Sequence, residues 1–258
     1  MDNMIAITID CEQWNLPQLR GKEGKITTDY SREGNKVLLK ILKKHKIKAT
    51  FFVTGYFAEK EAKQVKEISK NHEVACHGYS HFYRSNPSQD IENDINRAKK
   101  VLERTINKKV FGFRAPQMQF SMKLLKILNK KRFRYDSSLH PAFLPGYYIN
   151  LNYPIKPFIP KEMKIKEIPA AVMPYTRLPI SWFFMRNLGW RWAAYSAKEL
   201  IKKSIIPILY FHSWEFFPVK DKNVSKLITR NTGKKFANQF EKLLDYFKNE
   251  KFVTLKEI

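Results

Sequence analysis

Short apolar stretches that end in polar residues alternate with amphipathic stretches through the first half of the chain. Residues 4–9 are β-branched and apolar, and residues 33–45 repeat apolar side chains at helical spacing with lysines opposite. A second apolar stretch at residues 49–53 precedes a helical one at residues 59–69, and a third follows at residues 72–76. Because strands that alternate with helices favour a parallel sheet, the pattern predicts an α/β fold.

The alternation continues toward the C-terminus. A helix with a cap predicted at Asn86 or Ser88 leads to a strand at residues 110–113. Residues 140–195 show no sustained period, and we expect this irregular segment to shape a cleft. The other predicted elements are a helix at 121–130, a strand at 205–211, a helix at 234–249 and a strand at 252–255. No linker divides the sequence, so we expect one domain over residues 1–258.

Two carboxylates close the first predicted strand. If the strand's period of two persists to its end, Asp10 and Glu12 point to one side and Cys11 points to the core. Carboxylates at the C-terminal end of a first strand lie where α/β folds place their sites. The alternative is that both acids begin a solvated loop.

Two histidines four residues apart follow the third predicted strand, in the stretch His77-Gly78-Tyr79-Ser80-His81. Neutral imidazole is the commonest metal ligand in proteins, and such a pair needs one or two carboxylates to close a site. If the strands are parallel, this pair lies at the same end of the sheet as Asp10 and Glu12. By themselves, two histidines in a turn remain an equally good interpretation.

Further polar residues end the later predicted strands. Arg114 follows residues 110–113, Asp136 follows a short strand that contains phenylalanine, and His212 ends the strand at 205–211. An arginine near carboxylates can hold one of them ionised and oriented, although a surface salt bridge is the alternative. These residues are candidates for the same rim.

The net charge of the chain indicates which binding partners to expect, and its cysteines indicate the cellular compartment. The chain has 48 basic and 24 acidic residues, a net charge of +24, which favours anionic partners. The basic residues are spread along the chain without a concentrated arm, so we expect no specific nucleic-acid partner. Two cysteines make no disulfide framework, and no stretch resembles a signal peptide or reaches the ~20 apolar residues of a membrane span. We expect a cytoplasmic protein, with peripheral membrane contact through residues 180–185 left open.

Taken together, the rim motifs resemble the polysaccharide deacetylase family, the NodB-homology domain of carbohydrate esterase family four. The resemblance spans nearly the whole chain and is strongest to the peptidoglycan-deacetylase-like branch. Five motifs occur in the family's order: Thr8-Ile9-Asp10-Cys11-Glu12, His77-Gly78-Tyr79-Ser80-His81, Gly112-Phe113-Arg114-Ala115-Pro116, Tyr135-Asp136-Ser137-Ser138 and Leu209-Tyr210-Phe211-His212.

The resemblance implies a distorted (β/α) barrel that carries a divalent metal, zinc first, with cobalt, nickel, manganese and iron as alternatives. It implies a metal triad of Glu12, His77 and His81. Glu12 stands where the commonest form of the first motif has aspartate, and its longer reach could alter the metal geometry.

The resemblance also distributes the catalytic roles. Asp10 matches the general base, Arg114 the residue that positions it, and His212 the general acid that protonates the leaving amine. Asp136 matches a residue that orients or tunes His212. Ser213 departs from the branch, which has proline there.

These matches predict a metal-dependent hydrolase that removes acetyl groups from an N-acetylated sugar. A phosphate-linked or lipid-linked sugar would reconcile a cytoplasmic enzyme with a glycan substrate, and the positive charge would suit its phosphates. Two alternatives remain. One is a hydrolase of a small cyclic amide, similar to allantoinases and imidases, and the other is a non-catalytic basic protein that binds glycans or nucleic acid.

Overall fold

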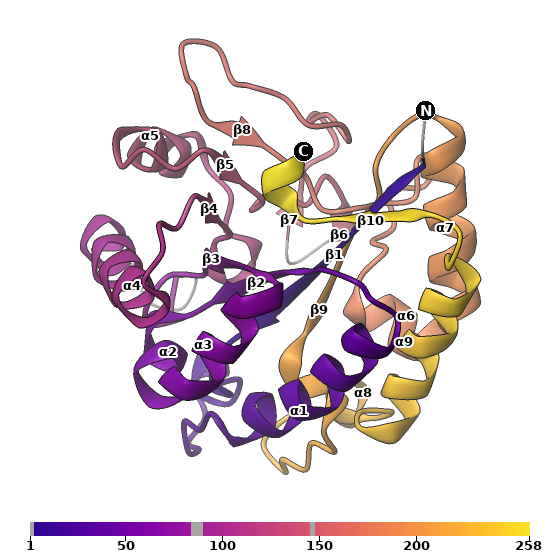
Figure 1. The fold of residues 1–258 in the computed structure, drawn as a ribbon, viewed down its shortest axis with the longest axis horizontal. Helices are drawn as coiled ribbons and strands as arrows, with labels where there is room; N and C mark the ends of the chain where they lie inside the picture. The colour runs from indigo at the N-terminus through magenta and orange to yellow at the C-terminus, as the bar shows by residue number, and fades with distance from the viewer. Residues whose placement is uncertain (1–2, 84–89, 145–147) are drawn as a thin grey trace.

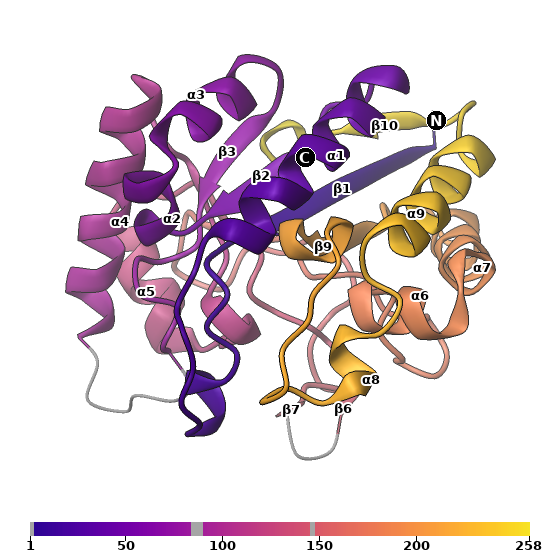
Figure 2. The same ribbon diagram turned by 90° about the horizontal axis from the view of Figure 1, so that it is seen from below.

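A computed structural model describes residues 3–83, 90–144 and 148–258. Its main sheet is parallel and curls into a half-barrel with helices on the outside (Figures 1 and 2), which confirms the predicted fold class. The sheet strands are β1 (Met4–Cys11), β2 (Thr50–Val53), β3 (Glu73–Cys76), β4 (Gly112–Phe113), β5 (Tyr135–Asp136), β8 (Lys166–Glu167), β9 (Ile208–His212) and β10 (Lys251–Val253). A separate antiparallel pair is formed by β6 (Phe143–Leu144) and β7 (Tyr148–Ile149).

Strand β1 lies at the centre of the sheet. One of its edges pairs with β9, in a register that sets Asp10 opposite His212. The start of β1 also pairs with β10 and its end with β2, after which β3, β4, β5 and β8 follow in order. The backbone pairing of β1 with β9 is therefore enough to bring residues from the start and the end of the chain side by side.

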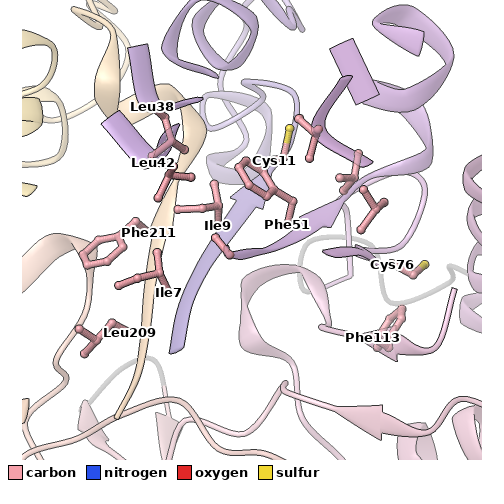
Figure 3. Packing of buried hydrophobic residues seen from close by; sticks show 14 of the residues in the cluster. Ile7, Ile9, Cys11, Leu38, Leu42, Phe51, Cys76, Phe113, Leu209 and Phe211 are labelled. Atoms are coloured by element: carbon pink, nitrogen blue, oxygen red, sulfur yellow. The ribbon is translucent and has the colours of Figure 1, made fainter. Parts of the chain in front are cut away.

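Alternate residues of β1 face opposite sides of the sheet. Ile7, Ile9 and Cys11 are buried and point toward Leu38 and Leu42 of helix α1 (Asp29–Lys44), as Figure 3 shows. This confirms the predicted core position of Cys11. The other set, which includes Asp10, faces the inside of the barrel.

An apolar cluster on the inner face of the sheet fills part of the barrel interior. Ala6, Phe52, Ala75, Tyr135 and Ile168 are among its members, and all are nearly inaccessible to solvent. The cleft opens at the strand ends, where Asp10, Glu12, His77 and His212 lie.

The helices are α1, α2 (Gly55–Lys60), α3 (Ala62–Asn71), α4 (Ile91–Ile106), α5 (Met122–Lys130), α6 (Trp182–Leu188), α7 (Trp190–Lys202), α8 (Lys226–Thr229) and α9 (Lys234–Tyr246). Most of them cover the outer face of the sheet, whereas α6 and α8 contribute residues to the cleft. Asp90 caps α4 by accepting from the backbone N–H of Asn93. The predicted caps Asn86 and Ser88 lie outside the described residues.

The irregular segment is shorter than the predicted range of about 140–195, because α6 begins at Trp182 and α7 follows it. The buried stripe of α7 consists largely of small residues, including Ala193, Ala194 and Ala197. The neighbouring tryptophans and tyrosines mask this stripe in the sequence, since alanines at helical spacing give a weak hydrophobic signal. None of the helices in the described ranges has both the length and the apolarity that a membrane crossing requires.

Candidate active site

A cleft of about 640 Å³ opens at the C-terminal ends of the strands. Five of the predicted site residues line it: Asp10, Glu12, His77, His81 and His212. Arg114 lies beneath them and is completely buried, whereas Asp136 does not line the cleft. The volume falls within the range of ordinary small-molecule sites.

Glu12, His77 and His81 converge on one point. The Glu12 Oε2 atom lies 2.8 Å from His81 Nε2 and 3.3 Å from His77 Nε2. One ligand atom from each residue lies within 4.8 Å of the other two, and all three residues are buried. The longer glutamate thus reaches the two histidines.

The outer ring nitrogens of both histidines are held by oxygen acceptors. His77 Nδ1 donates to the Arg114 carbonyl oxygen at 2.8 Å, and His81 Nδ1 donates to Asn15 Oδ1 at 2.9 Å. Because carbonyl and amide oxygens only accept, both Nε2 atoms of the neutral rings present lone pairs.

Those lone pairs meet the Glu12 Oε2 atom, which is buried and has no hydrogen-bond donor. Three acceptor atoms that face one another without a proton between them repel, and a divalent cation removes that repulsion. The residues therefore fit a metal with two imidazole ligands and one carboxylate.

The loop that carries both histidines is anchored by Asp94 on α4. Its carboxylate accepts from the backbone N–H groups of Tyr79 (2.7 Å) and Ser80 (3.0 Å) and from the Tyr83 hydroxyl (2.9 Å). Gly78 takes a left-handed φ of +67°, and a Cβ there would lie 2.9 Å from the Tyr83 hydroxyl. The loop geometry thus depends on a glycine and on an acid from the next helix.

Arg114 fixes one oxygen of Asp10. Its Nη1 donates to Asp10 Oδ1 at 2.7 Å and to the Thr8 hydroxyl at 3.0 Å. Its Nε and Nη2 donate to the backbone carbonyl and the hydroxyl of Ser137. Asp10 Oδ2 then faces the cleft, 3.9 Å from both His77 Nε2 and His212 Nε2.

His212 ends β9, and its Nε2 lies 4.0 Å from Glu12 Oε1. Its ring stacks on Trp214 with centroids 5.0 Å apart, and the Trp214 indole N–H donates to Glu12 Oε1. Its Nδ1 lies 3.6 Å from Glu215 Oε2. Burial lowers the pKa of His212, but the Glu215 carboxylate and the charges of Glu12 and Asp10 outweigh this effect and raise it above its usual value.

The turn after His212 packs tightly on helix α1. A Cβ on Gly34 of α1 would lie only 1.9 Å from the Ser213 carbonyl oxygen, so no larger residue fits without movement. The close approach holds the turn Ser213–Phe216, and with it Glu215, against the core.

Asp136 lies beside Glu167 of β8 rather than beside His212. Its Oδ1 accepts from the Ser138 hydroxyl at 2.6 Å, and the strand register pairs Asp136 with Glu167. Among the described residues, the acids within ion-pair distance of His212 are Asp10, Glu12 and Glu215. The register of β5 and β8 places Asp136 beside this second acid, whereas Glu215 Oε2 lies 3.6 Å from His212 Nδ1. The orienting role expected of Asp136 stays a prediction.

Several contributors to the site carry no clear signal in the sequence. Asn15 and Asp94 act on the histidines from outside the motifs, and Ser137 supports Arg114. His140 lines the cleft edge-on to Tyr210, and burial lowers its pKa to about 3. Trp182, Phe183 and Phe184, within the segment for which peripheral membrane contact was left open, line the cleft.

Comparisons with known proteins agree with this geometry. The sequence model of the polysaccharide deacetylase family matches residues 4–135, just over half of the chain. A peptidoglycan deacetylase of Helicobacter pylori is 35% identical over 120 residues, which cover 44% of this chain and 40% of that protein. The chain spans less than half the length of the curated relatives it matches first.

Solved structures of low sequence identity share the fold. A Mycobacterium smegmatis protein described as a polysaccharide deacetylase has a TM-score of 0.67 and 18% identity, covering 99% of this chain and 88% of that one. An allantoinase has a TM-score of 0.68 and 14% identity, covering 98% and 88%. At these identities the likeness establishes the fold alone.

Proposed function

The chain belongs to the polysaccharide deacetylase family, and we propose that it is a metal-dependent hydrolase that removes acetyl groups from an N-acetylated amino sugar. The observation that carries this proposal is the set of three buried acceptors on Glu12, His77 and His81, beside an aspartate whose second oxygen faces the cleft. A glycan deacetylase needs water activation, charge stabilisation and a proton for the leaving amine.

Glu12, His77 and His81 hold the metal in this proposal. Two imidazoles and one carboxylate suit zinc and also accept other divalent transition metals. When bound, such an ion supplies Lewis-acid polarisation of the amide carbonyl and a more acidic water. Asn15 and the Arg114 carbonyl keep the two rings oriented, and the Trp214 indole keeps the carboxylate oriented.

Asp10 is the proposed general base. Arg114 holds Oδ1, so Oδ2 is the oxygen that faces the cleft and can accept a proton from water there. The guanidinium is itself held by Thr8 and Ser137, which fixes the direction of the base.

His212 is the proposed general acid. Its Nε2 lies on the side of the cleft opposite His77, where it can give a proton to the departing amine. Glu215 stabilises the protonated ring through Nδ1, and the raised pKa of His212 keeps that proton available near neutral pH.

The substrate in this proposal is an amino sugar on a phosphate-linked or lipid-linked carrier. Trp182, Phe183 and Phe184 present aromatic surface in the cleft on which a sugar ring can pack. The net charge of +24 favours a substrate with phosphates. The thiols of Cys11 and Cys76 are free and buried, which supports our assignment of the activity to the reducing cytoplasm.

Mass spectrometry of candidate substrates tests this function. Zinc-loaded protein is incubated with N-acetylglucosamine oligomers, with polyprenyl-linked N-acetyl sugars and with allantoin. We expect loss of an acetyl group from a sugar substrate, and no such loss with Asp10→Asn protein that still binds zinc. Hydrolysis of allantoin alone, or of none of the substrates, contradicts the proposal.

A further inference from the structure

Three segments project around the mouth of the cleft. They are the loop of residues 13–28 with its 3₁₀ turn Gln18–Arg20, the β6–β7 pair, and the segment of residues 217–229 that ends in α8. Each contributes a residue to the cleft wall: Leu19, Leu144 and Ile228. Figure 2 shows all three segments on one side of the molecule, toward its lower edge, with β1 above them. We call this surface the mouth face.

Large apolar side chains are exposed on the mouth face. Phe143 is 44% exposed, Ile149 63% and Leu227 45%. Phe143 and Ile149 are cross-strand partners in the β6–β7 pair, so their side chains lie on the same face of that pair. Exposed apolar groups gathered at a cleft mouth mark a contact surface.

The two longer segments of the mouth face carry exposed basic side chains. Six exposed cations lie on the two longer segments: Arg20, Lys22, Lys25, Lys220, Lys222 and Lys226. Against them, residues 13–28 and 217–229 carry only two acids, Glu23 and Asp221, and Asp221 accepts from the Trp14 indole at 2.8 Å. The mouth face is therefore strongly positive.

Hydrogen bonds join the two basic segments into one wall. Lys22 Nζ donates to the Asn223 carbonyl oxygen at 3.2 Å, and the Asn223 side chain donates to the Glu23 carbonyl oxygen at 3.0 Å. Tyr30 at the start of α1 donates to the Lys220 carbonyl oxygen at 2.9 Å. The cations are thus presented together on a supported surface.

We propose that the mouth face docks the protein on the surface of an anionic phospholipid bilayer. Peripheral binding has two requirements: apolar side chains that enter the headgroup region, and basic side chains that attract anionic lipids. The mouth face has both. A purely polyanionic partner would use the lysines but would gain nothing from Phe143, Ile149 and Leu227. The aromatic residues at 182–184 serve the cleft, so the bilayer contact lies on the segments around them.

Docking in this orientation turns the cleft toward the bilayer. A sugar carried by a lipid then reaches Asp10 and His212 from the membrane surface without leaving it. This consequence for the substrate rests on the proposed deacetylase function, whereas the docking itself does not.

Sedimentation with vesicles tests the docking. The probes are phosphatidylcholine vesicles with and without phosphatidylglycerol. We expect binding only to the anionic vesicles, and a loss of affinity of about tenfold or more in Lys222→Glu/Lys226→Glu, since each basic residue near such a surface contributes about 1 kcal/mol. Phe143→Ser/Leu227→Ser leaves the charge unchanged, and we expect a similar loss from it.

A matched control separates a defined surface from the effect of net charge. Lys40 and Lys43 are exposed near the C-terminal end of α1, away from the cleft, and Lys40→Glu/Lys43→Glu makes the same change in charge. We expect this variant to bind vesicles nearly as well as the original protein. Equal losses in the two charge variants overturn the proposal, and so does unchanged binding by the serine variant, which indicates a polyanion instead.

Deacetylation of a polyprenyl-linked N-acetyl sugar embedded in the same vesicles separates this inference from the proposed function. Vesicle binding without acetyl release keeps the docking surface and removes the enzymatic proposal. Acetyl release from soluble sugars without vesicle binding keeps the enzymatic proposal and removes the docking surface.

Discussion

Two pairs of buried acids stand at the strand ends of the same sheet, and their surroundings differ. Asp10 and Glu12 end β1, whereas Asp136 and Glu167 end β5 and β8 and are register partners. All four side chains are nearly or completely inaccessible to solvent. Burial alone disfavours the charged form of any carboxyl group.

The two pairs differ in whether arginine or histidine side chains lie next to them. Arg114 binds Asp10, and the two imidazoles lie against Glu12. The second pair has a hydroxyl from Ser138 and backbone N–H groups instead, so burial raises the pKa of Asp136 to about 6 and that of Glu167 well above its usual value. The two pairs thus differ in what faces them: an arginine and two histidines face Asp10 and Glu12, whereas Asp136 and Glu167 face a hydroxyl, backbone N–H groups and each other.

Replacing Glu12 should give the largest effect. Glu12→Gln removes the anionic ligand, so we expect stoichiometric zinc binding to be lost and hydrolysis to fall by about 10³-fold or more. Metal analysis after dialysis and acetate release measure the two effects. Glu67→Gln on the exposed face of α3 makes the same chemical change and should alter neither. Full zinc occupancy in Glu12→Gln would remove Glu12 from the triad.

Replacing Asp94 should have an intermediate effect. Asp94→Asn places an amide N–H against the N–H groups of Tyr79 and Ser80, so the histidine loop loses part of its anchor. We expect zinc affinity, measured by competition with a chelating dye, to weaken about tenfold.

Asp90→Asn is the matched control, because it makes the same change at the cap of the same helix and asparagine caps equally well. Unchanged zinc affinity in a folded Asp94→Asn protein would show that the loop carrying His77 and His81 keeps its geometry without the Asp94 anchor.

The smallest effect concerns stability and pH. The pKa of Asp136 is raised in the folded protein from its ordinary value of 3.8 to about 6, so the stability it contributes is full below about pH 4 and is lost as the pH rises through 6. Asp136→Asn does not titrate there. We expect urea unfolding to show that the wild type gains stability relative to this variant by on the order of 1 kcal/mol between pH 7 and pH 5. A constant difference between the two proteins at both pH values would mean that the pKa of Asp136 is not raised in the folded protein.

The sequence is sufficient to predict the parts of the site whose geometry depends on local patterns. The period of two in β1 is enough to place Asp10 and Glu12 on one side and Cys11 on the other. The parallel order of the strands is enough to bring His77 and His81 to the same rim.

The sequence does not predict how distant strands pair or which residues outside the motifs support the site. Glu215 reaches His212 because a 3₁₀ turn folds back on α1, and Asp136 turns to Glu167 because β5 pairs with β8. The pairing of β5 with β8 leaves no trace in residue spacing, and the three-residue spacing of His212 and Glu215 does not by itself predict a turn there. The helix α7 was missed because its buried stripe is alanine-rich, and the anchors Asn15 and Asp94 act from outside the motifs.

Acetate release by zinc-loaded Asp10→Asn and Asp136→Asn, measured side by side on one N-acetylated sugar substrate, tests the central claim most directly. Both substitutions replace a buried aspartate at a strand end with its closest neutral analogue. We predict that Asp10→Asn lowers the rate by about 10²- to 10⁴-fold, as expected for loss of a general base, while Asp136→Asn stays within a few-fold of the wild type. Equal losses in the two variants, or a larger loss in Asp136→Asn, would contradict the assignment of the site to the acids that face Arg114 and the histidines.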